Sequence, residues 1–279
     1  MTKTLQKVRL STINKLSKAM LNQVSIDTFQ EDGIAFMPGL FKAHVESLRI
    51  GVQKNIEKPG PFAAENTKEG ETGRFFDDYC NWQRIDEFRN AAFDKNVAKT
   101  AALLMQSKTV QMFHDHVLVK EAGTLTSTPW HTDGPYYFVK GVKTLSFWVP
   151  LDPVKDATLR MVAGSHRWPK PVLPTRWLSN ENFYPTTDEY LPVPDPEKEH
   201  MDIKEFNMEP GDAVAFNFNI LHGARGATAD QRRRAFSLRL LGDDTSYTER
   251  PGPTSPPFPQ HNMEESQVLR TDWFPFIEF

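Results

Sequence analysis

Two histidines and one aspartate are the residues of this chain best suited to chemistry. The segment Trp130-His131-Thr132-Asp133-Gly134 contains a His-x-Asp pair, and His222 lies far downstream in Leu221-His222-Gly223. Two imidazoles and one carboxylate can hold a divalent iron on one face and leave the opposite face open. Because side chains alternate along a strand, we expect His131 and Asp133 to point into the same interior. The pattern predicts an iron site completed by His222 from a distant strand.

A basic cluster that follows His222 could bind an anion. Arg232-Arg233-Arg234 opens an apolar strand, in which alternation places Arg233 and Ser237 on one face and Phe236 on the other. A guanidinium is permanently charged and can bind a carboxylate through two parallel hydrogen bonds. We therefore expect Arg233 to bind a carboxylate beside the metal. Arg232 or Arg234 would take this role if the strand began with a bulge.

Together these residues resemble the phytanoyl-CoA dioxygenase family of iron(II)- and 2-oxoglutarate-dependent oxygenases, bacterial branch. The resemblance covers about residues 114–245 and is strongest from Thr128 to Tyr137, in Gly164-Ser165-His166-Arg167 and from Leu240 to Asp244. It implies Fe(2+), O2 and 2-oxoglutarate, which chelates the iron through its C1 carboxylate and C2 oxo group. It also implies release of succinate and CO2 and hydroxylation of an unactivated C–H bond of a small organic substrate.

The resemblance extends to residues around the cosubstrate and the substrate. It places the distal carboxylate of 2-oxoglutarate on Arg233 and Ser237, and it makes Trp148 a wall of the cosubstrate pocket, although core packing would also explain Trp148. Lys120 matches a recurring family position and either reaches one of the ligands or pairs with Glu121. The other cofactor-binding candidates are Thr144 and His116, and the substrate candidates are Tyr136, Tyr137 and Arg160.

The class of substrate is suggested only by charge. Arg160, Arg167, Lys170 and Arg176 cluster around a proline-rich insertion. They could attract an anionic or acyl substrate, such as a carboxylate or an acyl thioester, or they could form only a solvated surface. Desaturation and ring closure remain open as outcomes, because the family name does not fix the chemistry of a site.

Two other functions are open at this point. His114-Asp115-His116 followed by Glu121 matches part of a cupin metal motif, although Lys108 stands where that motif has glycine. A non-catalytic, ligand-binding jelly roll would share the fold. Halogenation is disfavoured, because related halogenases replace the carboxylate ligand by a small residue and this chain has Asp133.

Composition excludes several classes of protein. The net charge of −3 gives no general attraction to nucleic acid or anionic membranes, and one cysteine excludes a disulfide framework and a cysteine-based zinc site. No apolar run is long enough to span a bilayer. We expect a small-molecule partner, and either a monomer or a homodimer.

The order of elements predicts a mainly β (α+β) fold, a double-stranded β-helix or jelly roll with flanking N-terminal helices. The first hundred residues are predicted mainly helical, with helices over 42–56 and 94–106. Strands are predicted over 109–120, 127–137, 144–151, 159–162, 213–218 and 235–241. We expect one domain over 1–279, with support in 1–108, a core in 109–245, an insertion at 169–200 and a tail, 246–279, that packs on the domain.

The first 26 residues are basic, and Asp27 is the first acidic residue. No apolar segment typical of a secretory signal follows. An amphipathic surface helix in a cytoplasmic protein is the preferred interpretation, and a mitochondrial presequence is the alternative.

Overall fold

The computed structural model describes residues 23–67, 70, 72–155, 159–176, 179, 181–226 and 231–279. Most of the expected N-terminal amphipathic helix falls on residues 1–22, outside the described residues, whereas residues 23–32 are helical. Within the described part of the chain, no helix is both long and apolar enough to cross a membrane.

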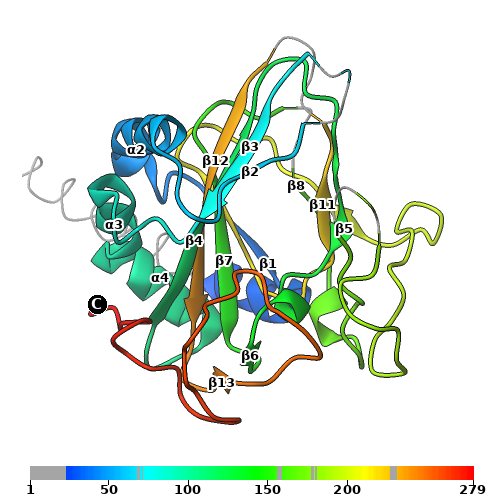
Figure 1. Ribbon diagram of the computed structural model, residues 1–279. Coiled ribbons are helices and arrows are strands. Elements are labelled where there is room, and N and C mark those ends of the chain that lie inside the picture. The colour runs from blue at the N-terminus through cyan, green and yellow to red at the C-terminus, as the bar shows by residue number, and fades with distance from the viewer. Residues whose placement is uncertain are drawn as a thin grey trace, which may run out of the picture.

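Two facing antiparallel sheets form the core (Figure 1), which confirms the predicted mainly β jelly roll. The large sheet has the order β1-β10-β7-β12-β4-β3-β2, and the small sheet has the order β5-β11-β8-β9. The large sheet contains β1 (Ile34–Met37), β2 (Ala64–Glu65), β3 (Phe75–Tyr79), β4 (Gln111–Lys120), β7 (Thr144–Pro150), β10 (Ala213–Phe216) and β12 (Arg233–Leu241). The small sheet contains β5 (Thr128–His131), β8 (Leu159–Val162), β9 (Ile203–Lys204) and β11 (His222–Ala224), while β6 (Val139–Lys140) pairs with β13 (Ser246–Tyr247).

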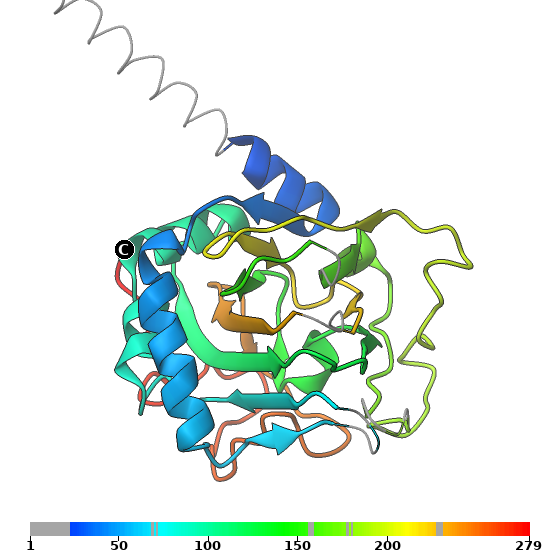
Figure 2. The ribbon, with the colours of Figure 1, turned by 90° about the horizontal axis from the view of Figure 1, so that it is seen from above.

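Helices cover the outer face of the large sheet (Figures 1 and 2). They are α2 (Val45–Glu57), α3 (Asp86–Ala92) and α4 (Lys95–Met105), so both predicted helices are present and α3 is additional. The Asp94 carboxylate caps α4 by accepting hydrogen bonds from the backbone N–H groups of Asn96 and Val97. Leu48 of α2 and Phe88 of α3 pack with Phe236 of β12 in one buried cluster.

The central strand β12 separates this helix-covered core from the interior between the sheets. Phe236, Leu238 and Leu240 belong to the cluster under the helices. Alternation turns Arg233 and Ser237 the opposite way, toward the small sheet. The register has no irregularity before Arg239, so the bulge that would have brought Arg232 or Arg234 inward is absent from the start of β12.

The structure departs from the sequence-based secondary structure in two places. The described part of the first hundred residues contains more helix than strand, as predicted, but β1, β2 and β3 were not predicted and join the large sheet. The strand predicted over 127–137 ends at His131, because the chain turns into the 3-10 helix η2 (Gly134–Tyr136), with Asp133 already in a helical conformation. Alternation along a strand therefore does not explain the position of Asp133.

The insertion and the C-terminal tail both lie against the barrel. The insertion has isolated bridges, such as Val172 with Leu191, in place of long strands. In the tail, Phe274 is fully buried against Phe113 and Phe138, and the Ile277 N–H donates to the Val110 carbonyl. These contacts hold residues distant in sequence against one end of β4.

Candidate metal centre and adjoining cavities

His131 and His222 are direct cross-strand partners, since β5 and β11 are neighbours in the small sheet. Their ring centroids lie 4.2 Å apart. His131 Nδ1 lies 2.8 Å from the Pro129 carbonyl oxygen, and His222 Nδ1 lies 2.9 Å from that of Ile220. A carbonyl only accepts, so each Nδ1 carries the proton and donates. Each Nε2 is therefore left with its lone pair, as a metal ligand requires.

Asp133 completes the group from the turn that follows β5. Its Oδ1 lies 3.7 Å from His131 Nε2 and 3.8 Å from His222 Nε2. The three ligand atoms lie within 4.8 Å of one another, in the one group with metal-ligand spacing that the described residues contain. Ligand atoms at this spacing can surround one ion at the usual bond lengths of about 2.0–2.2 Å.

Burial sets the protonation states that a metal needs. It lowers the pKa of His131 to about 3, with a further contribution from His222, and it also lowers the pKa of His222. Burial alone would raise the pKa of Asp133, but the Arg239 guanidinium and the two imidazoles outweigh it and hold that pKa below its ordinary value. At neutral pH the site therefore offers two neutral imidazoles and one carboxylate.

The second carboxylate oxygen of Asp133 is held from the large sheet. Arg239 Nη2 and Ser146 Oγ each lie 3.3 Å from Asp133 Oδ2, and Arg239 Nε lies 3.2 Å from the Tyr137 hydroxyl. These contacts orient Oδ1 toward the imidazoles, as groups behind a metal ligand commonly do. The sequence analysis assigned Arg239 no role, although it shares the inward face of β12 with Arg233.

We expect Arg239→Leu to destabilise the metal-free protein by about 3–5 kcal/mol, because it leaves the buried Asp133 carboxylate without its cation. Urea unfolding measures this loss. Arg234→Leu is the matched control, because it breaks the ion pair of Arg234 with Asp152, in which each side chain is 14% exposed. This variant should lower the free energy of unfolding by about 1 kcal/mol. Equal losses in the two variants would contradict the role given to Arg239.

A second prediction concerns acidification. The folded-state pKa values of His131 and His222 lie below the ordinary value of 6.5, so below pH 6.5 the unfolded chain binds protons that the folded protein excludes. Their stabilising contribution is full above pH 6.5 and is lost as the pH falls toward 3. For His131 alone the loss at pH 4.5 is about 2–3 kcal/mol. Urea unfolding of metal-free protein from pH 7.5 to 4.5 should show this slope, and His131→Gln should reduce it; an equal slope in that variant would contradict the assignment.

A small cavity between the sheets begins at the two imidazoles and ends at Arg233. Trp148, Ser237 and His116 also line it, so the structure brings together most of the predicted cofactor-binding residues. Burial lowers the pKa of Arg233 to about 10, and Ser237 Oγ is buried without a hydrogen bond to the described residues. A desolvated guanidinium beside an unsatisfied hydroxyl fits a carboxylate.

Two predicted cofactor-binding residues have other surroundings. Lys120 is fully buried beside Arg233 in the register, but its Nζ donates to the Thr126 carbonyl at 2.7 Å and lies 4.4 Å from the centre of the Phe75 ring. Thr144 lines a different cavity, and its Oγ1 accepts from the Phe218 N–H at 3.3 Å. Thr144 lies at the end of β7 that is remote from Arg233, which explains why the structure does not bring it to the metal.

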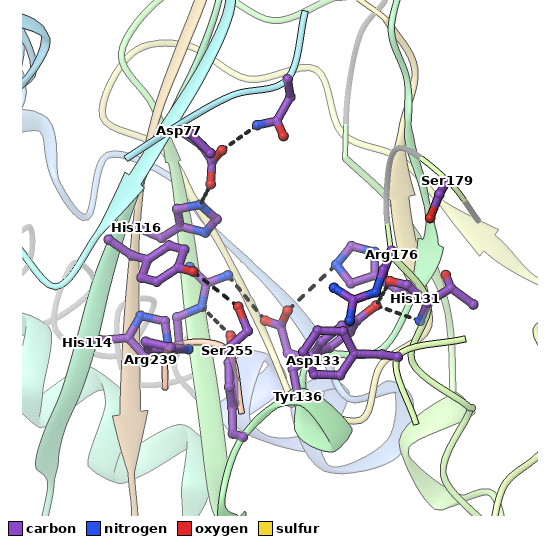
Figure 3. Close-up of a pocket in the computed structure, with 17 residues that line it drawn as sticks. Asp77, His114, His116, His131, Asp133, Tyr136, Arg176, Ser179, Arg239 and Ser255 are labelled. Carbon is purple, nitrogen blue, oxygen red and sulfur yellow. Dashed lines mark hydrogen bonds and ion pairs between the residues drawn. The ribbon is translucent and has the colours of Figure 1, made fainter. Parts of the chain in front are cut away.

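A larger cavity of about 410 Å³ opens on the other side of the centre (Figure 3). Tyr136 and Tyr137 line it, as predicted, and the insertion contributes Arg176 and Phe183. Arg160 does not line this cavity. Arg160 is paired in the register with Gly223, next to the inward-facing His222, so its side chain points outward and binds Glu197 and Glu205.

The cupin-like alternative is not supported by the geometry. His114 and His116 line the larger cavity, but Glu121 does not, and these three residues form no ligand group within the described chain. His116 Nε2 instead lies 2.9 Å from Asp77 Oδ2. Asp77 and Tyr79, both on β3, are cavity residues that the sequence analysis missed.

The phytanoyl-CoA dioxygenase (PhyH) family matches residues 29–235, about three quarters of the chain. The chain belongs to this family. It is therefore an iron(II)- and 2-oxoglutarate-dependent oxygenase by descent, as the sequence predicted. None of the curated proteins matches it.

Solved structures show the same fold at low identity. SnoN, a non-heme alpha ketoglutarate dependent epimerase from nogalamycin biosynthesis, is 19% identical with a TM-score of 0.74, over 94% of this chain and 97% of SnoN. SnoK, a carbocyclase from the same biosynthesis, is 22% identical with a TM-score of 0.69, over 91% and 95%. EctD from S. alaskensis is 18% identical with a TM-score of 0.61, over 78% and 75%.

Proposed function

We propose that this protein is a dioxygenase that hydroxylates an unactivated C–H bond of a small organic substrate and converts 2-oxoglutarate into succinate and CO2. The observation that carries the proposal is the position of the trio His131, Asp133 and His222 between two different cavities. One cavity ends in a guanidinium and suits a dicarboxylate. The other is larger and has aromatic walls.

The residues present fit the metal and the cosubstrate that the family uses. His131, Asp133 and His222 would hold Fe(II), and Arg233 with Ser237 would hold the distal carboxylate of 2-oxoglutarate. When bound, these two groups supply the activation of O2 that an unactivated C–H bond needs. The protein residues supply position: Trp148, Leu159 and Phe216 line the small cavity with apolar surface.

Hydroxylation is favoured over halogenation by the ligand set. The Asp133 carboxylate occupies the position that a halide would need, and Arg239 and Ser146 hold it there. Epimerisation and ring closure are the outcomes named for SnoN and SnoK, which share the fold. These outcomes begin from the same kind of C–H bond and are therefore the second candidate for this site.

An anionic or acyl substrate is supported by Arg176. This exposed side chain comes from the insertion and lines the larger cavity, and its guanidinium carbon lies 5.2 Å from the centre of the Phe183 ring. Figure 3 draws Arg176 among the side chains that line this cavity. A cation held by an aromatic face at the entrance would attract a carboxylate.

The proposal is tested by turnover with a panel of candidate carboxylic acids. We expect one acid to raise O2-dependent succinate release above the rate without substrate, and its product to gain one oxygen atom from 18O2 by mass spectrometry. A product with two hydrogens fewer and no added oxygen would favour ring closure or desaturation. If iron and 2-oxoglutarate bind but no acid of the panel raises succinate release, the assignment of this protein as an oxygenase of carboxylic acids is contradicted.

A further inference from the structure

The wall of the larger cavity that faces the metal ligands contains a histidine–carboxylate pair. His116 on β4 and Asp77 on β3 line this cavity, and His116 Nε2 lies 2.9 Å from Asp77 Oδ2. Both side chains are more than nine-tenths buried. In Figure 3 the pair lies across the cavity from His131 and Asp133. The pair is therefore separate from the metal ligands but opens on the same space.

The second carboxylate oxygen of Asp77 is also occupied. Asn66 Nδ2 donates to Asp77 Oδ1, which fixes the carboxylate from behind. The ring of Tyr79 meets the His116 ring edge to face at a centroid distance of 5.3 Å and limits its rotation. The orientation of the His116 ring is thus determined by contacts on two sides.

This orientation defines what His116 can bind. A carboxylate accepts, so Nε2 carries a proton and donates to Asp77, and the neutral ring then presents Nδ1 as an acceptor. The hydrogen bonds found for His116 within the described residues involve only Nε2. An acceptor nitrogen on a buried ring that lines a cavity is suited to a ligand O–H group.

We propose that His116, held by Asp77, binds a hydroxyl group of the substrate, so that the substrate is a hydroxyl-bearing compound. This inference rests on the proposed function, because it concerns the same cavity. Tyr79 and Ser255, whose hydroxyl oxygens lie 3.2 Å apart, add polar groups to this wall, while Tyr136, Tyr137 and Phe183 make other walls aromatic. The frame that carries the hydroxyl is therefore mainly apolar.

His116 lies at a wall that the two cavities share. His116, His131 and Arg239 line both the larger cavity and the small one behind the metal trio. A hydroxyl bound to His116 would lie across the larger cavity from His131 and Asp133, so the apolar frame of the substrate would extend from that hydroxyl toward the metal ligands.

The test uses two sets of probes that differ at a single group. One set is 2-naphthol, 2-fluoronaphthalene and naphthalene; the other is 6-hydroxy-2-naphthoate, 6-fluoro-2-naphthoate and 2-naphthoate, which adds a carboxylate for Arg176. Fluorine is close to hydroxyl in size but cannot donate. Binding is measured by anaerobic calorimetric titration of the full chain loaded with Fe(II) and 2-oxoglutarate, whose visible absorption band shows that the centre is assembled.

In the wild type we expect the hydroxyl compound of at least one set to bind about tenfold more tightly than its fluoro analogue, which corresponds to about 1.4 kcal/mol. His116→Phe should reduce this ratio to near one in protein whose absorption band shows that the centre is assembled. His200→Phe, a matched substitution at an exposed histidine, should leave the ratio unchanged.

Equal binding of hydroxyl and fluoro compounds in both sets, no binding in either set, or an unchanged ratio in His116→Phe would overturn the inference. If His116→Phe fails to assemble the centre, the wild-type comparison decides alone. A wild-type protein without the absorption band would instead count against the proposed function. The two failures are therefore distinguishable.

Discussion

Replacing His222 by alanine is expected to abolish iron binding and turnover. Three side chains would hold the metal, and the other two come from one short segment, His131 to Asp133, so no other described residue is placed to replace the missing imidazole. Loss of a side chain that hydrogen-bonds to a metal ligand typically lowers metal affinity or activity by about 10–100-fold. Loss of a ligand itself should lower them by more than about 100-fold. Iron affinity by anaerobic titration and succinate release are the two measurements.

His200→Ala is the matched control for this variant, since His200 is an exposed histidine of the insertion. It should retain wild-type iron affinity. Folding is checked separately by circular dichroism, because the His222 ring also packs against Phe216 at a centroid distance of 4.7 Å. A folded His222→Ala protein with wild-type iron affinity would rule out the proposed ligand set.

Replacing Arg233 by methionine is expected to weaken 2-oxoglutarate binding by at least about 30-fold and to leave iron affinity unchanged. The guanidinium is buried, so its hydrogen bonds to a carboxylate would form without competition from water. Removing one partner of a buried charged pair costs about 2–5 kcal/mol, which gives a loss of this size. Methionine keeps most of the side-chain length and its packing.

Arg232→Met provides the control for Arg233. The Arg232 side chain is 46% exposed and lies 3.9 Å from Asp152, outside the cavity, and Arg234 forms hydrogen bonds with the same Asp152 carboxylate. The apparent Kd of 2-oxoglutarate, measured anaerobically with Fe(II) present, should therefore stay at the wild-type value in Arg232→Met. An equal loss in both variants would indicate a general electrostatic effect and not a specific carboxylate site.

The sequence predicted that His131, Asp133 and His222 come together, but it did not predict how Asp133 joins the two histidines. His131 and His222 meet because β5 and β11 are neighbours in the small sheet, as a jelly roll allows. The strand ends at His131, so Asp133 reaches the two histidines through the turn that follows. Asp133 does belong to the metal-binding group, but strand alternation was the wrong explanation for its position. A His-x-Asp spacing is compatible with both geometries, and only the structure distinguishes them.

Polar cavity residues on β3 could not be predicted by periodicity. Phe75-Phe76-Asp77-Asp78-Tyr79 is buried on both faces, so apolar and polar residues do not alternate along it. Asp77 faces the cavity and binds His116, whereas Asp78 Oδ2 accepts from Asn55 of α2 on the other side of the sheet. The two adjacent aspartates therefore point to opposite sides of the large sheet. Which side each one faces depends on the elements that surround β3 and not on the sequence of β3 itself.

Arg239 and Arg160 show the same limit for basic residues. Alternation along β12 gives Arg239 the same inward face as Arg233, but its contact with Asp133 depends on the turn after β5. Arg160 lies close to other basic residues in sequence, yet its strand turns it outward to two glutamates. Sequence proximity of charges therefore did not reveal that Arg160 pairs with two glutamates, and alternation along β12 did not reveal the partner of Arg239.

The central claim is that His131, Asp133 and His222 form a single iron centre that takes 2-oxoglutarate beside Arg233. Its most direct test is an anaerobic titration of the wild-type protein with Fe(II) in the presence of 2-oxoglutarate, followed by visible absorption. We expect a weak charge-transfer band that saturates at one iron per chain and is absent without 2-oxoglutarate. Iron bound with no such band, or a band that persists in His222→Ala, would contradict the account.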